Sequence, residues 1–168
     1  MKTAKRLLAL ALAGVMALAL LTGCSDSSSE ARQVEEYFRY RRGQLTDYQK
    51  DETLDKKLEA IAQQFQPDWL DDINGGLTED ARSIIRNELS DYVIAGDVTP
   101  WVGEVKPGQS ALAQAESMKC YMKIQFGNYD PSGTALHAIA FTMTDKKSDG
   151  RRYYLALETY ATIKTPQN

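Results

Sequence analysis

The spacing of apolar residues changes near Gly96, and this change limits the fold more than any other feature of the chain. Before Gly96, apolar side chains recur every three or four residues, which is the period of an amphipathic helix. After it they alternate with polar side chains, which is the period of a half-buried strand. Because helices come first and strands follow over short loops, we expect an α+β fold: three N-terminal helices packed on a curved antiparallel sheet of about four strands.

The helical pattern predicts three helices. They are expected at about residues 30–42, at about residues 53–66, and from an N-cap at Thr78 to a C-terminal cap at Gly96. Thr78 is a good N-cap, and the acids Glu79 and Asp80 suit the positive end of the helix dipole. Pro67 is expected to end the second helix, since the residue before a proline disfavours the helical conformation.

The alternating pattern predicts four strands. They are expected at about residues 98–105, in a long strand that ends at Phe126, and at about residues 134–144 and 151–163. Pro100 predicts a sheet edge or a bulge in the first strand, because proline has no amide hydrogen for a neighbouring strand. Cys120 is expected on the apolar face of the second strand, where burial raises the pKa of a thiol and leaves it unreactive.

The chain begins with a segment that is typical of exported proteins. Lys2, Lys5 and Arg6 precede an apolar run over residues 7–21. A positive start, a short apolar stretch and a small-residue exit are the three parts of a secretory signal. The run is shorter than the roughly 20 residues that a transmembrane helix needs. An uncleaved membrane anchor is the alternative interpretation.

Leu21, Thr22, Gly23 and Cys24 close this segment and resemble the lipobox of bacterial lipoproteins. The resemblance implies that a lipid is attached to the Cys24 thiol and that a peptidase cuts between Gly23 and Cys24. The lipid would hold the protein on a cell membrane, facing outside the cytoplasm, either in a periplasm or on a Gram-positive surface. The implied division is a signal peptide at 1–23, a lipidated polar tether at 24–30, a single domain at 31–164 and a polar tail at 165–168.

Charge and cysteine content argue against two kinds of protein. The first 23 residues hold three of the 20 Lys and Arg and none of the 23 Asp and Glu, so the mature chain has a net charge of −6. An acidic domain is a poor candidate for binding nucleic acid. Cys120 is the only cysteine besides Cys24, so the fold cannot depend on an internal disulfide.

His137 is the single histidine and the obvious candidate for a general base. Its strand face is otherwise apolar, which favours a histidine packed at the rim of the core over a catalytic one. If His137 is functional, its site is expected between the sheet and the helices, with neighbours drawn from Tyr153, Tyr160 and Glu158.

The other clusters have structural explanations as well. Tyrosine favours strands, yet a tyrosine cluster on a concave sheet could bind an apolar or sugar-like ligand. The candidates are Tyr121, Tyr153 and Tyr160. Solvated turns and helix ends explain the acids between residues 68 and 80 and the cations Arg39, Arg41 and Arg42, with contact to anionic head groups as the alternative for the cations. No metal and no cofactor are expected.

The order of helices and strands also resembles the cone-shaped rolls of nuclear-transport-factor-like and cystatin-like domains, over about residues 30–164. This resemblance is one of architecture and implies no activity. We therefore expect a non-enzymatic binding or accessory domain of the cell envelope, with an unknown protein or small molecule as its ligand. The alternatives are a small-pocket hydrolase or isomerase that uses His137, and an assembly protein that acts through a sheet edge near Pro100 or at the last strand.

Overall fold

The computed structural model describes residues 29–44, 47–71, 76–127 and 133–164. The described residues form an α+β fold, as the sequence predicts. The proposed signal peptide, Cys24 and the polar tail lie outside the described residues. Within them, no helix combines the length and the apolar character that crossing a membrane would require.

The helical segments begin where the sequence places capping residues. The N-terminal helix covers residues 29–43, α2 is Glu52–Gln64, α3 is Glu79–Leu89, and a 3-10 turn covers Pro67–Trp69. The Asp51 side chain accepts a hydrogen bond from the Leu54 amide at 2.7 Å, and Thr78 Oγ1 accepts one from the Ala81 amide at 3.3 Å. Both bonds satisfy amides that have no partner inside their helices. The predicted N-cap at Thr78 is therefore confirmed.

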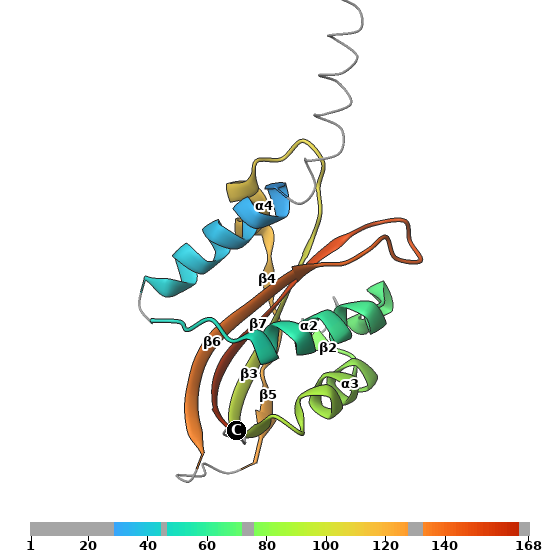
Figure 1. Ribbon diagram of the computed structural model, residues 1–168. Coiled ribbons are helices and arrows are strands. Elements are labelled where there is room, and N and C mark those ends of the chain that lie inside the picture. The colour runs from blue at the N-terminus through green and yellow to red at the C-terminus, as the bar shows by residue number, and fades with distance from the viewer. Residues whose placement is uncertain (1–28, 45–46, 72–75, 128–132, 165–168) are drawn as a thin grey trace, which may run out of the picture.

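The main sheet is antiparallel. Its strands are β3 (Val93–Glu104), β4 (Lys119–Cys120), β5 (Ile124–Phe126), β6 (Thr134–Met143) and β7 (Tyr153–Ile163). The order is β4-β3-β7-β6, and β5 also pairs with β3. A separate two-stranded pair, β1 (Leu70–Asp71) and β2 (Gly76–Leu77), lies between α2 and α3 in the sequence. The long strands bend so that α2 and α3 lie inside the curve (Figure 1).

The two faces of the sheet pack against different helices. On one face, α2 and α3 bury a large apolar cluster that includes Leu58, Ile85 and Leu157. On the other face, the N-terminal helix and α4 (Ala111–Ser117) bury a smaller cluster around Val34, Phe38 and neighbouring strand residues. The N-terminal helix crosses only the α4 end of the sheet (Figure 1). The opposite end of this second face is therefore left without a helical cover.

The third helix ends earlier than predicted, and Gly96 does not cap it. Helix α3 ends at Leu89, and Gly96 lies inside β3 with φ +108°. A Cβ atom at this position would lie 2.5 Å from the carbonyl oxygen of Tyr160 in β7. Glycine is needed here for the left-handed backbone and for the close approach of two strands, and not for a helix end.

The predicted sheet edges are also wrong. Strand β3, which contains Pro100, pairs with β7 on one side and with β4 and β5 on the other. The Pro100 carbonyl accepts a hydrogen bond from the Tyr121 amide at 2.9 Å, between the residues paired with β4 and with β5. The amide and the carbonyl of a strand residue face the same neighbouring strand. The side of Pro100 that lacks an amide hydrogen therefore faces the break between β4 and β5. The last strand, β7, is likewise an inner strand, between β3 and β6.

The predicted long strand ending at Phe126 is broken into three elements. Its first part is helix α4, which begins at an N-cap where Ser110 Oγ accepts a hydrogen bond from the Ala113 amide. The strands β4 and β5 follow, separated by residues 121–123. Tyr121 is buried while Met122 is 64% exposed, so the simple alternation fails at this break. The fold thus has one helix more and one sheet strand more than expected among the described residues.

Candidate functional site

A carboxylate lies in the middle of the sheet. Glu158 is in the inner strand β7, opposite Thr99 of β3 and Ile139 of β6, on the face that the N-terminal helix covers. Its side chain is 13% exposed. A charge with so little access to water needs hydrogen-bond partners, because burying it unpaired is costly.

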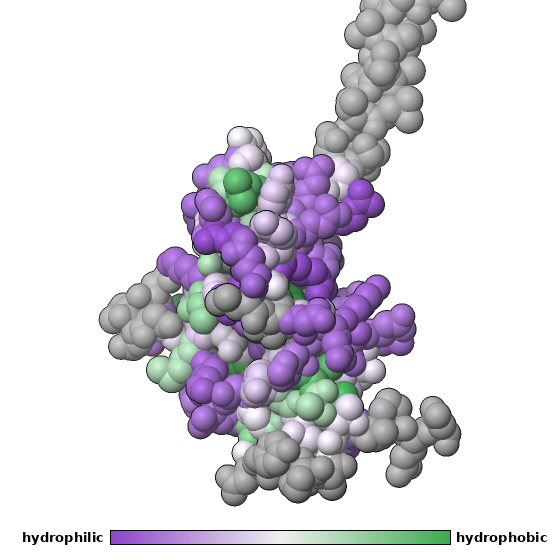
Figure 2. All heavy atoms as spheres, turned by 90° about the vertical axis from the view of Figure 1, so that its left-hand side faces the viewer, coloured by the Kyte–Doolittle hydropathy of each residue, from purple (hydrophilic) through white to green (hydrophobic). Residues whose placement is uncertain are grey.

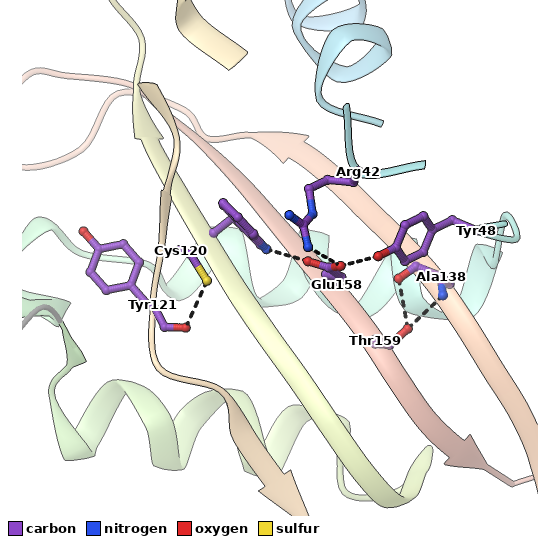
Figure 3. A network of polar contacts seen from close by, with 8 residues as sticks. Arg42, Tyr48, Cys120, Tyr121, Ala138, Glu158 and Thr159 are labelled. Atoms are coloured by element: carbon purple, nitrogen blue, oxygen red, sulfur yellow. Dashed lines mark hydrogen bonds and ion pairs between the residues drawn. The ribbon is translucent and has the colours of Figure 1, made fainter. Parts of the chain in front are cut away.

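Three donors from distant parts of the chain meet at Glu158 (Figure 3). Arg42 Nη2, at the end of the N-terminal helix, donates to Oε1 at 2.8 Å, and the Tyr48 hydroxyl donates to the same oxygen. Trp101 Nε1 in β3 donates to Oε2 at 3.1 Å. Both carboxylate oxygens are therefore occupied by donors from the protein itself.

The surroundings of Arg42 strengthen this cluster. Its guanidinium carbon lies 4.8 Å from the centre of the Trp101 ring, within the range of a cation–π contact. Phe38 packs edge-on against the same ring, with centroids 5.4 Å apart. The hydrogen bond to Glu158 holds the pKa of Arg42 above its usual range. We interpret the Glu158 cluster (Arg42, Tyr48, Trp101 and Glu158) as a clamp that holds the N-terminal helix on the sheet.

His137 and Tyr160 lie next to the clamp, on the uncovered end of the same face. Their rings are stacked, with centroids 4.1 Å apart and planes 26° apart, because the two residues are directly opposite on β6 and β7. Tyr160 is 67% exposed. The pair lines an open hollow of about 660 Å³, whose polar walls include Asp97 and Gln125. A second hollow of about 490 Å³ shares Asp97 and Tyr160 and extends to the Glu158 cluster.

The predicted neighbours of His137 are only partly correct. Tyr160 is its stacking partner, but Tyr153 points to the α2 and α3 face and is buried there. The His137 pair also faces away from α2 and α3, so a site between the sheet and those helices is wrong. Among the described residues, the contact recorded for the His137 ring is its stacking on Tyr160, with no hydrogen bond to another side chain. The described residues therefore provide a stacked aromatic surface at His137, and none of them pairs with its ring as an acid or a base.

The structure does not bring the three candidate tyrosines together. Tyr121 is 4% exposed and Tyr153 is 5% exposed, and both belong to the core under α2 and α3. The Tyr153 hydroxyl donates to Asp149 Oδ2 at 2.6 Å. Burial, together with this bond to Asp149, raises the pKa of Tyr153 to about 12. Tyr160 alone, of the three, offers its ring to a ligand.

Cys120 is exposed, contrary to the prediction that it is buried on an apolar strand face. It lines the hollow beside the Glu158 cluster, and its Sγ lies 3.7 Å from the Tyr121 carbonyl oxygen. Partial burial of the thiol and the nearby negative charge of Glu158 raise its pKa. The direction of this pKa shift agrees with the sequence-based expectation, and partial burial of the thiol is its largest cause.

The charged clusters near the helix ends are engaged within the protein. Arg39 pairs with Glu35 at 2.7 Å, Arg41 pairs with Glu116 at 3.2 Å, and Arg42 belongs to the clamp. Each of the three arginines therefore has an acidic partner within the protein, although the Arg41 side chain stays 52% exposed. Among the described residues, no three His, Cys, Asp or Glu side chains are grouped as metal ligands would be.

Sequence reasoning missed the clamp because its members are far apart in the chain. Arg42 and Glu158 are 116 positions apart, and Tyr48 and Glu158 are 110 apart. One signal was available: Glu158 is the only charged residue within the strand predicted at 151–163, after its first two residues. An isolated acid in an otherwise apolar and aromatic strand predicts a buried partner, but it does not identify that partner.

Comparisons with known proteins give no relative to set beside this geometry: no family model, no curated protein and no solved structure matches the chain.

Proposed function

We propose that the protein is a lipid-anchored binding domain of the cell envelope, without enzymatic activity, that presents the hollow at His137 and Tyr160 to its ligand. The anchor part rests on the lipobox at residues 21–24. The binding part rests on the stacked His137–Tyr160 pair in an open hollow. The resemblance to nuclear-transport-factor-like and cystatin-like rolls stays a prediction and adds no ligand.

The single observation that carries the proposal is the position of the hollow relative to the start of the domain. Glu30 lies at the α4 end of the sheet, where its Oε1 accepts a hydrogen bond from Gln114 Nε2 at 2.5 Å. The hollow is lined by residues at the other end of β3, β6 and β7. A protein anchored six residues before Glu30 would therefore turn this hollow away from the bilayer, where a ligand can reach it.

The anchor is tested by the intact mass of the protein purified from membranes of a bacterial host. We expect a chain that begins at Cys24 and carries a diacylglycerol or triacyl modification. Cys24→Ser should abolish the modification and the cleavage. Cys120→Ser is the matched control, and it should leave both unchanged. An unmodified Cys24 with residues 1–23 still attached would disprove the anchor.

The binding face is tested by photocrosslinking in intact cells. A photoreactive residue at Gln125, in the wall of the hollow, should form a defined adduct that is lost when Tyr160→Ala is added. The same photoreactive residue at Asn87, which is exposed on α3, is the control. Equal adducts from both positions, or an adduct that does not depend on Tyr160, would contradict a binding role for the hollow.

A further inference from the structure

We propose that the basic hairpin surface, formed by Lys106, Lys146, Arg151 and Arg152, lies on the bilayer and contacts anionic phospholipid head groups. The inference rests on the proposed function, because it takes Cys24 as the lipidated anchor. It adds a second contact with the membrane and fixes which end of the domain faces it.

The first argument is the length of chain between the anchor and the described domain. Six residue steps separate Cys24 from Glu30, and they span at most about 21 Å when fully extended. Glu30 lines a hollow of about 470 Å³ together with Lys146, Arg151 and Arg152. Anything that lies beside Glu30 is therefore held close to the membrane surface when Cys24 carries a lipid.

Burial and charge around Tyr154 support this neighbourhood. Tyr154 lines the same hollow and is 1% exposed. Burial, with a contribution from the negative charge of Glu30, raises the pKa of Tyr154 to about 12. The start of the N-terminal helix and the turn between β6 and β7 are thus neighbours through space.

The second argument is the distribution of charge along the molecule. Residues 144–152, which join β6 to β7, hold four Lys and Arg and two Asp, a net charge of +2. Residues 67–97, which include α3 at the other end of the sheet, hold two Arg and eight Asp and Glu, a net charge of −6. An anionic bilayer attracts the first region and repels the second. The same orientation therefore follows from charge and from the tether.

The cations of the basic hairpin surface differ in how exposed their side chains are and in whether they are paired with an acid. Lys106 and Lys146 are exposed. Arg151 pairs with Glu104 at 3.2 Å but its side chain is 58% exposed. Lys147 is not part of the surface, because its Nζ donates to the Ala62 carbonyl at 2.7 Å at the end of α2. Figure 2 shows the side of the molecule that lies on the left in Figure 1, away from the hairpin, and hydrophilic residues cover much of its coloured surface.

The hairpin is held in place by its own bonds. The Lys147 amide donates to the Arg151 carbonyl at 2.8 Å, and the Arg151 amide donates to Asp149 Oδ1 at 3.0 Å. Asp149 also accepts a hydrogen bond from the Tyr153 hydroxyl, so both of its carboxylate oxygens have donors within the hairpin. A preordered basic surface loses little entropy on contact, and one lipid group joined to a basic surface anchors more firmly than the lipid alone.

The test uses the full lipidated protein in vesicles that contain a lipid with a nitroxide on its head group, which quenches nearby fluorophores. A fluorophore is attached at Ser148→Cys in the hairpin or at Asn87→Cys in α3, each in a Cys120→Ser background. In vesicles containing phosphatidylglycerol, we expect quenching at position 148 to exceed quenching at position 87 several-fold. Replacing the anionic lipid by phosphatidylcholine, or raising the salt to about 1 M, where charges are screened beyond about 3 Å, should reduce that excess.

Charge reversal gives the decisive comparison. Lys106→Glu with Lys146→Glu should lower the quenching at position 148, whereas the control pair Lys50→Glu with Lys56→Glu makes the same change in net charge on exposed residues elsewhere and should not. Equal quenching at 148 and 87, or no response to the first pair, would overturn the inference while a lipidated Cys24 left the proposed anchor intact. An unmodified Cys24 would overturn both.

Discussion

The face of the sheet under α2 and α3 is mainly apolar, whereas the face under the N-terminal helix has a carboxylate in its middle and an open aromatic pair at one end. On the first face the buried Thr159 Oγ1 is paired with the Ala138 backbone at 3.0 and 3.2 Å, and the Tyr153 hydroxyl donates to Asp149 at 2.6 Å. On the second face Glu158 is paired with three side chains. Hydrophobic burial thus holds α2 and α3 on one face of the sheet, and the Glu158 cluster helps to hold the N-terminal helix on the other. We therefore expect the first face, which buries the larger apolar cluster, to carry most of the stability of the fold.

The largest effect is expected from truncating a side chain in the α2 and α3 core. Leu58 is 1% exposed, so Leu58→Ala should lower the free energy of unfolding by about 2–5 kcal/mol through lost burial and an unfilled cavity. Urea denaturation measures the loss. Leu112→Ala is the control, because Leu112 is 43% exposed in α4. Similar losses for the two variants would show that burial in this core does not determine the loss of stability.

A smaller and more local effect is expected from breaking the clamp. Glu158→Leu leaves Arg42, Tyr48 and Trp101 without their acceptor and should lower the free energy of unfolding by about 1.5–3 kcal/mol. Hydrogen exchange should become faster in the N-terminal helix and stay unchanged in α2 and α3. Glu104→Leu removes an exposed pair with Arg151 and should cost less, about 0–1 kcal/mol. Faster exchange throughout the molecule after Glu158→Leu would contradict a separate clamp.

A pH-dependent effect is expected from Tyr153→Phe on the α2 and α3 face. Two hydrogen bonds hold the pKa of Asp149 below its usual range. The larger effect comes from the Tyr153 hydroxyl and the smaller from the Arg151 amide. A carboxyl with a lowered pKa stabilises the folded state above its unfolded pKa of about 4, and this contribution is lost as the pH falls through the folded value. The variant should therefore have a higher Asp149 pKa by NMR titration and a weaker loss of stability below about pH 4. An unchanged Asp149 titration would exclude the bond as its cause.

The smallest effect on stability is expected at the open end of the second face. Tyr160 is 67% exposed, so Tyr160→Ala should change the free energy of unfolding by only about 0.5 kcal/mol. The stacked contact with His137 is lost, which should shift the His137 ring signals in the NMR spectrum. A large loss of stability would show that the pair is a structural contact, and would weaken its proposed binding role.

Local sequence patterns predicted where helices and strands lie better than they predicted which elements pack against one another. The alternation over residues 134–144 and 151–163 matches β6 and β7 within two residues at each end, and Thr78 caps α3 as expected. The failures lie where a local signal has two meanings. Gly96 suits a helix cap as well as a tight strand contact, and the long strand expected before Phe126 includes α4, a helix of only seven residues. Contacts with distant segments decide between such alternatives, and a local pattern does not contain them.

The sequence by itself predicted α2, β6, β7 and the start of α3 at Thr78, and it carries the resemblance to a lipobox, because each of these depends on residues within a few positions of one another. Only the tertiary structure decided which face the N-terminal helix covers, which donors reach Glu158, and that His137 meets Tyr160 on the uncovered end. The physical reason is that alternation assigns a side chain to one of two faces without saying what will cover that face. The cover comes from segments up to 116 positions away, whose approach depends on the packing of the whole chain.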